Sequence, residues 1–526
     1  MPQSRKFAWY IVTQWTASLV NAAVAIALIP FLQRELGDSG YGLTVVVLTI
    51  ANFSLIAQFG LRAALGRHMA EQVALGDNEA VNRFFTTSLV TFALISLVVS
   101  AVLIVFAVPI VRICQIDPDQ FHDAVFLVRV FSSVMVALAL LQPAWESVLF
   151  GHSRFDLSDF AMIVEYLLRA GGVIAVLTWT DWGVLGWCGA VLFSRSASVL
   201  LTGVFAHLYH KGLKARRRYV DGPTLRELLS LGGVVSLRQT AARLSMTVEP
   251  LIVSSFLGTV GVSFYNPAVR MVNAPWPFII AVARQFTPMA TGRHTTGDQR
   301  GLQEILFRGT RLMFSIATLP TVLLIAFAHP IVEVYLGPGR EVTAWVLVVS
   351  SIGQLVQYSI GSQWQVMLGK NDVRVMSIWQ IAAATVSIVA SVGLAMGAMA
   401  WVAPPNQMMA CLIAVVAPAI VIRTVERVVV GAYVAHHCGS SARAYFVEAY
   451  WGPILVMVIC LAVSLLLRWQ WVLDSWLALI AAATVVSAFW CLGTWFFVFD
   501  ETDRNRAMAV FHRRRPVSGA NNSPSD

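Results

Sequence analysis

The chain has 526 residues, of which 57% are apolar and only 12% are charged, and its formal net charge is +9. Soluble domains usually carry about a quarter charged residues, so this composition excludes an ordinary soluble enzyme or binding domain. The six cysteines have no paired spacing, which excludes a disulfide framework or a zinc site. The positive charge does not predict a nucleic-acid partner, because it follows one side of a predicted membrane protein.

Apolar stretches long enough to cross a bilayer follow one another along the chain. A helical span needs about 20 apolar residues, and the first such stretches cover residues 8–32, 43–65 and 84–111. The first stretch is too long for the apolar region of a cleavable signal peptide, so none is expected. We predict an all-α polytopic membrane protein with about fourteen spans, centred near residues 20, 54, 97, 136, 168, 196, 243, 277, 320, 356, 386, 418, 457 and 484.

The basic residues predict which way the spans run. Alternate loops carry most of the lysine and arginine, and the segment 211–218 alone contains five basic residues: Lys211, Lys214, Arg216, Arg217 and Arg218. Cytoplasmic loops are enriched in such residues, so both termini are expected to be cytoplasmic. Trp179, Trp182 and Trp187 predict an aromatic belt at the outer interface.

Short motifs recur at an offset of 221 residues. Leu36-Gly37 with Gly40 recurs as Leu257-Gly258 with Gly261, Gly76-Asp77 as Gly297-Asp298, and Pro109 as Pro330. Three matches in register predict an internal repeat of six spans. An even number of spans gives parallel repeats, related by a pseudo-twofold axis along the membrane normal.

This repeat predicts how the chain is divided. We expect an N-lobe at 1–210, a basic cytoplasmic linker at 211–225 and a C-lobe at 226–440. Two further spans follow at 441–500, and a partly disordered cytoplasmic tail occupies 501–526.

Charged side chains inside the apolar spans predict a polar interior. A central arginine costs about 2.5–3.5 kcal/mol on insertion, so such residues normally face a cavity or one another. Arginine outnumbers glutamate here, which favours an anionic substrate, and guanidinium groups suit phosphate oxygens. Two alternatives stay open: an internal ion pair for Glu165 and Arg169, and snorkelling at span ends for Arg62 and Arg284. The substrate-binding candidates are Arg62, Arg129, Arg169, Arg195, Arg238, Arg243, Arg270, Gln354 and Gln357, and the ion-coupling candidates are Glu146, Glu165 and Glu249.

Several short motifs place the chain near a known superfamily. It resembles the polysaccharide (O-antigen type) flippases of the multidrug/oligosaccharidyl-lipid/polysaccharide exporter superfamily. Two positions depart from that pattern: Phe59 stands where an acidic residue is frequent, and Glu249 stands where aspartate is common. The matching residues are Pro30-Phe31-Leu32, Leu36-Gly37, Tyr41-Gly42, Phe59-Gly60-Leu61-Arg62, Ala70-Glu71, Gly76-Asp77, Leu257-Gly258, Gly261, Tyr265 and Arg270.

The resemblance implies a function at the bacterial inner membrane. A flippase of this type turns a lipid-linked oligosaccharide of the undecaprenyl-diphosphate type from the cytoplasmic to the periplasmic leaflet, by alternating access, for surface or exopolysaccharide synthesis. Its partners would be that lipid and the surrounding membrane lipids, with a polysaccharide polymerase and its chain-length machinery. No GxxxxGK[ST] loop or HExxH motif is present, so we expect a transporter without cofactor or metal and not an enzyme.

Other functions remain open at this stage. A cation-coupled multidrug exporter or a flippase of a lipid-linked peptidoglycan precursor would share the architecture. A membrane-embedded polysaccharide ligase or polymerase would be expected to carry a large periplasmic loop, and no spacing here is long enough for one. A pure scaffold would not justify so many buried charges.

Overall fold

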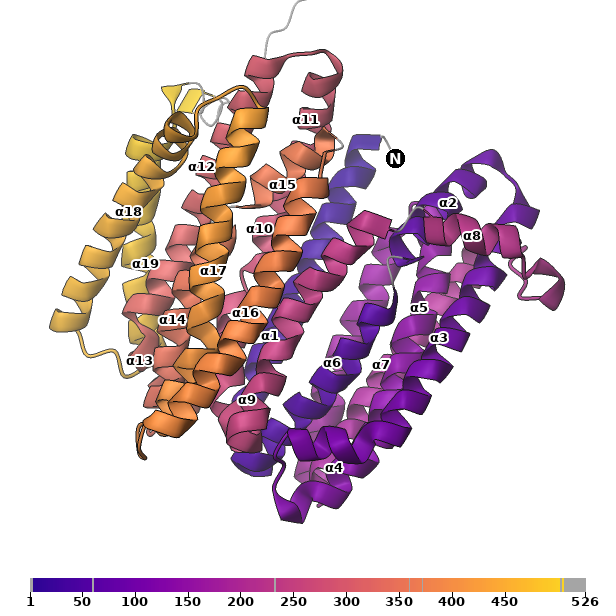
Figure 1. Cartoon of the computed structure of the whole chain (residues 1–526), viewed down its shortest axis with the longest axis horizontal. Helices are drawn as coiled ribbons and strands as arrows, with labels where there is room; N and C mark the ends of the chain where they lie inside the picture. The colour runs from indigo at the N-terminus through magenta and orange to yellow at the C-terminus, as the bar shows by residue number, and fades with distance from the viewer. Residues whose placement is uncertain are drawn as a thin grey trace, which may run out of the picture.

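The computed structural model describes residues 3–58, 61–230, 233–358, 360–370, 372–501 and 504–505 (Figure 1). The side chains at 3–8, 10–11, 54–55, 63, 230, 233–246 and 360 lie outside this description, as does most of the predicted tail. The described residues are almost entirely helical and contain no strand. The predicted all-α fold of a polytopic membrane protein is confirmed.

The first lobe is formed by the N-terminal helices, which pack against one another. A π-helical turn, Val128–Ser132, joins two of them. The helices are α1 (Gln3–Phe53), α2 (Leu61–Leu75), α3 (Asn78–Ile113), α4 (Phe121–Leu127), α5 (Ser133–Gly151), α6 (Phe155–Trp179) and α7 (Gly183–Tyr209).

The second lobe follows a short amphipathic helix, α8 (Gly222–Ser230). Two further helices, α18 (Ala442–Gln470) and α19 (Trp476–Gly493), pack beside this lobe, chiefly through α12. The helices of the second lobe are α9 (Gly233–Asn273), α10 (Trp276–Ala283), α11 (Phe286–Thr295), α12 (Gln299–Ala326), α13 (Ala328–Leu336), α14 (Glu341–Tyr358), α15 (Ile360–Gly369), α16 (Arg374–Trp401) and α17 (Gln407–His437).

Twelve stretches of the described chain are helical, long and apolar enough to cross a membrane. Two of them, Val12–Gln58 and Thr247–Thr295, are 47 and 49 residues long, which is about twice the length that one crossing needs. Each is interrupted by a glycine with non-helical backbone angles, Gly37 or Gly258. Each therefore has room for two crossings, while the count of fourteen stays a prediction.

The two interrupting glycines share one backbone conformation. Gly37 has φ 67° and ψ 177°, and Gly258 has φ 63° and ψ −165°. This region is open almost only to glycine, because a Cβ atom would clash with the backbone. The repeat seen in the sequence thus marks a chain reversal that occurs once in each lobe. Ser39 and Thr259, which lie close to Gly37 and Gly258 in the sequence, are joined by a hydrogen bond of 2.8 Å, and we call this end of the molecule the elbow end. We call the opposite end, which carries α8, the linker end (Figure 1).

A second repeated motif, a glycine followed by aspartate, begins a helix at the linker end of each lobe. Gly76 and Gly297 have φ angles of 73° and 70°, and each is followed by an aspartate. The Asp77 carboxylate accepts from the amides of Glu79 and Ala80, while Asp298 accepts from the amide of Gly301. Such N-caps satisfy amides that have no partner within the helix, which explains the recurring Gly-Asp pair.

The described hydrogen bonds between the two lobes cluster at the elbow end. The Gln33 side chain donates to the Ser263 carbonyl at 3.1 Å, and the Asn266 amide donates to the Tyr41 hydroxyl at 2.6 Å. The Asp38 carboxylate accepts a hydrogen bond from the Ser263 hydroxyl at 2.9 Å and forms an ion pair with Arg340 at 2.8 Å. The lobes are therefore fastened to each other at the elbow end.

The basic segment at the linker end is attached to the first lobe. Asn82 on α3 donates to the Gly212 carbonyl at 3.0 Å and accepts from the Lys214 amide at 2.7 Å. Thr87 donates to the Tyr219 carbonyl at 3.1 Å. These bonds hold the start of the predicted linker against α3, so any flexibility between the lobes lies beyond it.

The predicted tryptophan belt at the outer interface stays a prediction, and its three members differ in exposure. Trp179 and Trp182 are 83% and 68% exposed. The prediction for Trp187 is wrong: it is only 6% exposed and packs against Phe131, with ring centroids 5.8 Å apart. It lies one turn inside α7, where the helix turns that side toward the core of the lobe.

Gly42→Ala should destabilise the protein, because a Cβ at Gly42 would lie 1.9 Å from the Thr259 carbonyl oxygen. Overpacking of this kind costs about 1–3 kcal/mol. Thermal unfolding in detergent measures the effect. The matched control is Gly171→Ala, where a Cβ meets no atom within 4 Å. Equal melting temperatures for the two variants would contradict the close approach of the lobes.

Candidate functional site

A glutamate that binds two arginines lies in the first lobe. Glu165 and Arg169 on α6 form an ion pair one helical turn apart, and Arg195 on α7 pairs with the second Glu165 oxygen at 3.0 Å. The Glu165 side chain is buried, while those of Arg169 and Arg195 are 25% and 20% exposed. The cluster therefore carries one net positive charge, and its arginines are the members that reach its surface.

Both arginines have hydrogen-bonding capacity left. The Nε atoms of Arg169 and Arg195 are buried and have no hydrogen-bond partner. A guanidinium group has five N–H donors, so one carboxylate cannot occupy two of these groups. The two arginines therefore keep N–H donors for a further anion.

Three more charged groups extend this cluster within the first lobe. Arg62 on α2 forms an ion pair with the buried Glu146 on α5 at 2.6 Å. Glu146 in turn lies close enough to Asp159 on α6 for their charges to repel. Asp159 accepts from the Thr13 hydroxyl of α1 at 3.1 Å.

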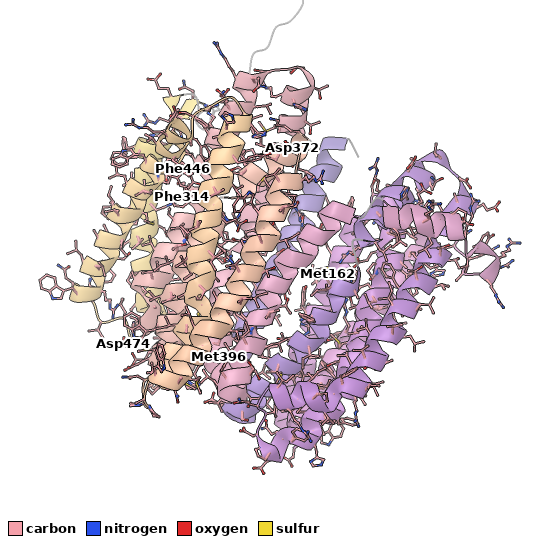
Figure 2. The ribbon with its side chains drawn as sticks, viewed as in Figure 1. Met162, Phe314, Asp372, Met396, Phe446 and Asp474 are labelled. Atoms are coloured by element: carbon pink, nitrogen blue, oxygen red, sulfur yellow. The ribbon has the colours of Figure 1, made fainter. Side chains whose placement is uncertain are left out.

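The face of α6 that carries these groups is turned toward the second lobe. Figure 2 shows Met162 of α6 at the space between the two lobes. Asp159 lies about one turn before Met162 and Arg169 two turns after it, so they share its face of the helix. We call Arg62, Glu146, Asp159, Glu165, Arg169 and Arg195 the first-lobe cluster.

The second lobe contains its own charged pair, Glu249 on α9 and Arg423 on α17. Their side chains are 3.3 Å apart, and Glu249 also accepts from the Tyr265 hydroxyl at 2.5 Å. They line a cavity of about 50 Å³ together with Asn273, Ser350 and Gln354. That volume is enough for ordered water.

Two polar atoms at this cavity are unsatisfied. The Gln354 side-chain nitrogen and the Ser350 hydroxyl are buried without a hydrogen-bond partner. Buried polar groups of this kind normally bind water or ligand. Gln354 therefore lies where the sequence predicted a polar surface.

Three charged residues of α17 complete the second-lobe cluster and were missed by the sequence reasoning. Besides Arg423, the buried Arg427 binds the Gln357 side-chain oxygen at 2.5 Å and pairs with Glu426 at 3.5 Å. Their signal is present, because charges interrupt the apolar run of residues 419–430. We call Glu249, Gln354, Gln357, Arg423, Glu426 and Arg427 the second-lobe cluster.

The remaining candidates lie elsewhere. Arg129 is exposed, binds the Ile104 carbonyl at 3.3 Å and is flanked by the exposed apolar residues Phe126 and Val130. It does not join the first-lobe cluster. Arg270 is exposed on α9, one turn beyond Asn266, which binds Tyr41 of the first lobe.

Two further candidates, Arg238 and Arg243, are on α9, and their side chains lie outside the described residues. Among the described side chains, no hydrogen bond or ion pair joins the two clusters, and no group of three His, Cys, Asp or Glu could hold a metal ion.

All three ion-coupling candidates are paired with arginine. Glu146 binds Arg62, Glu165 binds Arg169 and Arg195, and Glu249 binds Arg423. In each case a guanidinium group already balances the charge that a coupling cation would balance.

The described residues form a two-lobe, all-helical membrane protein with charged clusters inside its lobes, and the sequence assigns this protein to a family. Residues 6–289, more than half of the chain, match the family described as "Polysaccharide biosynthesis protein". The chain belongs to this family, and the resemblance seen in the sequence is confirmed.

Similar known proteins match most of the length of this chain. It is 22% identical over 515 residues to the "Uncharacterized membrane protein EpsK" of Bacillus subtilis, covering 96% of this chain and 98% of that protein. It is 20% identical over 336 residues to a "Putative O-antigen transporter" of Shigella flexneri, covering 64% and 78%. The solved structure of the lipid II flippase MurJ shares the fold, with a TM-score of 0.65, 13% identity and coverage of 93% and 98%.

Glu165→Gln should destabilise the protein by about 2 kcal/mol, because it leaves Arg169 and Arg195 without a counter-charge. Removing one partner of a fully buried pair costs about 3–5 kcal/mol, and the partial exposure of the arginines reduces this. The double variant Glu165→Gln/Arg195→Gln should lose less than the sum of its single variants, as measured by a thermal double-mutant cycle.

The control for this cycle is Glu35→Gln, which breaks the exposed Arg34–Glu35 pair and should change stability little. Additive effects of the two cluster substitutions would show that the pair seen in the structure does not couple.

Proposed function

We propose that the protein flips a polyprenyl-diphosphate-linked oligosaccharide from the cytoplasmic to the periplasmic leaflet for surface or exopolysaccharide synthesis. The observation that carries the proposal is the first-lobe cluster, in which two arginines share one glutamate and keep unused donors. A diphosphate supplies the negative charge and the acceptor oxygens that this cluster lacks.

The relatives support this choice of substrate class. The chain belongs to a family described by polysaccharide biosynthesis, and one relative is named as an O-antigen transporter. The protein is accordingly a carrier and not an enzyme. A polysaccharide polymerase and its chain-length machinery would take up the flipped lipid.

Orientation follows from charge. We place the linker end, with its five exposed basic residues at 211–218, on the cytoplasmic side of the inner membrane, together with both termini. The elbow end, where the lobes are fastened, then faces the periplasm.

The diphosphate would bind Arg169 and Arg195 first, with Arg62 nearby. Arg270 lies on the second lobe beside an inter-lobe contact, so it would join when the lobes rock together. Arg238 and Arg243 belong to the same proposal from the sequence alone, whereas Arg129 is left out because its side chain lies among exposed apolar residues. Gln354 and Gln357 would offer amide groups to sugar hydroxyls.

Coupling of transport to a proton would follow from competition between the diphosphate and Glu165 for the two arginines. When the diphosphate binds Arg169 and Arg195, the buried Glu165 loses its two ion-pair partners. A proton taken up at Glu165, or in the same way at Glu146 or Glu249, would be released when the arginines return. This exchange needs no metal ion.

Two alternatives differ in cargo. A multidrug exporter of the same superfamily would carry cationic compounds, which the net positive charge of the Glu165, Arg169 and Arg195 group disfavours. A flippase of a lipid-linked peptidoglycan precursor would use the same diphosphate chemistry, and the shared fold with MurJ favours it as the second candidate. Complementation of strains that lack one activity or the other separates the two.

Arg169→Ala and Arg195→Ala, expressed at normal levels, should each lower transport at least tenfold. Each charged hydrogen bond to phosphate contributes about 1.5–3 kcal/mol. The measurement is the amount of lipid-linked oligosaccharide in each leaflet of cells that depend on the protein. The control is Arg374→Gln, an exposed residue at the start of α16. Full transport by both alanine variants would overturn the proposal.

A further inference from the structure

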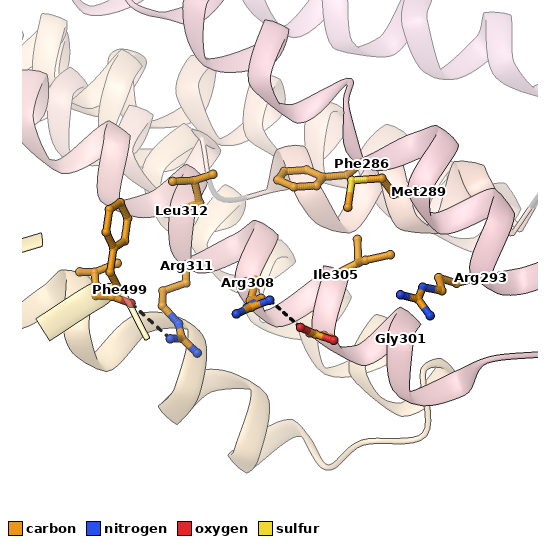
Figure 3. A pocket seen from close by; sticks show the side chains of 11 residues that line it. Phe286, Met289, Arg293, Gly301, Ile305, Arg308, Arg311, Leu312 and Phe499 are labelled. Atoms are coloured by element: carbon orange, nitrogen blue, oxygen red, sulfur yellow. Dashed lines mark hydrogen bonds and ion pairs between the residues drawn. The ribbon is translucent and has the colours of Figure 1, made fainter. Parts of the chain in front are cut away.

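A second basic pocket lies in the second lobe, apart from both clusters. It has a volume of about 610 Å³ and lies between α11, α12 and the C-terminal segment that follows α19. Figure 3 shows it from close by. Its lining includes Phe286, Met289, Arg293, Arg308, Arg311 and Phe499.

One face of α12 forms the floor of this pocket. Gly301, Ile305, Arg308 and Leu312 recur at intervals of three or four residues, which places them on the same side of the helix. At 1.5 Å per residue, Arg308 and Arg311 lie about 14 and 18 Å from the start of α12. They are therefore well inside a helix that can span the membrane.

The arginines of the floor are more buried than their acidic partners. Arg308 pairs with Glu304 at 2.5 Å, and Arg311 pairs with Asp500 at 2.9 Å. The two arginine side chains are 21% and 16% exposed, whereas Glu304 and Asp500 are 56% and 52% exposed. The Nε atom of Arg311 is buried without a hydrogen-bond partner. Positive charge thus remains on the inner side of the pocket.

The walls of the pocket are apolar. Phe286 and Met289 of α11 stand on one side, and Phe499 of the C-terminal segment stands on the other (Figure 3). Arg293 lies at the rim and pairs with the half-buried Asp298. Basic groups beside an apolar wall match a molecule that has an anionic head and a hydrocarbon chain.

We propose that this pocket binds the phosphate ester of a membrane lipid. Arg308 and Arg311 bind the phosphate oxygens, and the first part of the lipid chain packs against Phe286, Met289 and Phe499. Basic pockets between transmembrane helices are suited to anionic lipid headgroups, and the volume falls within the usual range of ligand sites. The lining comes only from the second lobe and the C-terminal segment, so the site persists when the lobes move.

Two sources can supply this chemistry: an anionic phospholipid, or a polyprenyl phosphate on its way to or from transport. The second source rests on the proposed function, and the first does not. Because both carry a phosphate ester on a lipid chain, the pocket is tested with both lipids.

The experiment uses the full chain in phosphatidylcholine nanodiscs. Thermal unfolding and native mass spectrometry are recorded after addition of dioleoyl-phosphatidylglycerol, undecaprenyl phosphate or inorganic phosphate. We expect one of the two anionic lipids to bind and to raise the melting temperature. Arg308→Gln and Arg311→Gln should each weaken that binding at least tenfold, and Arg308→Lys should retain part of it.

The matched control is Arg300→Gln, an exposed arginine on the same helix that does not line the pocket. Phosphatidylglycerol binding identifies a structural lipid site and stands even if transport assays fail. Binding of undecaprenyl phosphate alone identifies a carrier-lipid site. If neither lipid binds above phosphatidylcholine, or if both glutamine variants bind as well as the wild type and Arg300→Gln, the proposal is overturned. Should Arg311→Gln fail to fold, Arg308→Gln decides the outcome.

Discussion

Burial of charge inside a membrane is the constraint on which the rest of this structure depends. An unpaired arginine at membrane depth is costly, and the structure meets that cost by sharing Glu165 between Arg169 and Arg195. The sharing leaves one excess positive charge around Glu165. A lipid diphosphate would compete with Glu165 for the two arginines, so the arrangement that makes these residues tolerable in the membrane also defines what they can bind.

The chain reversals at the elbow end set the point about which the two lobes rock. Gly37 and Gly258 reverse the chain with nearly the same backbone angles. The inter-lobe hydrogen bonds gather around these reversals, with Asp38 at their centre. Because these bonds lie at one end, rocking about that end changes the separation of the lobes at the other. The small residue Gly42, beside the Thr259 carbonyl, lets the lobes approach closely enough for this contact.

Local patterns predicted the features that depend on local physics. The glycine repeat, the Gly-Asp helix starts and the Glu165–Arg169 pair could be read from the sequence, because each is set by residues a few positions apart. Arg195 was a candidate, but its partner could not be named from spacing, since the pair joins two helices. Arg423 lies 174 residues from Glu249, and no periodicity relates them. Trp187 was misplaced because composition alone does not tell which side of a helix faces the lobe interior.

The central claim is that a diphosphate and Glu165 compete for the same two arginines. The most direct test is the affinity of the purified protein for a short-chain polyprenyl diphosphate, measured by titration calorimetry. We predict that Arg169→Gln and Arg195→Gln weaken binding at least tenfold, while Glu165→Gln tightens it because the competing carboxylate charge is gone. Unchanged affinity in the arginine variants, or weaker binding by folded Glu165→Gln, would contradict the account.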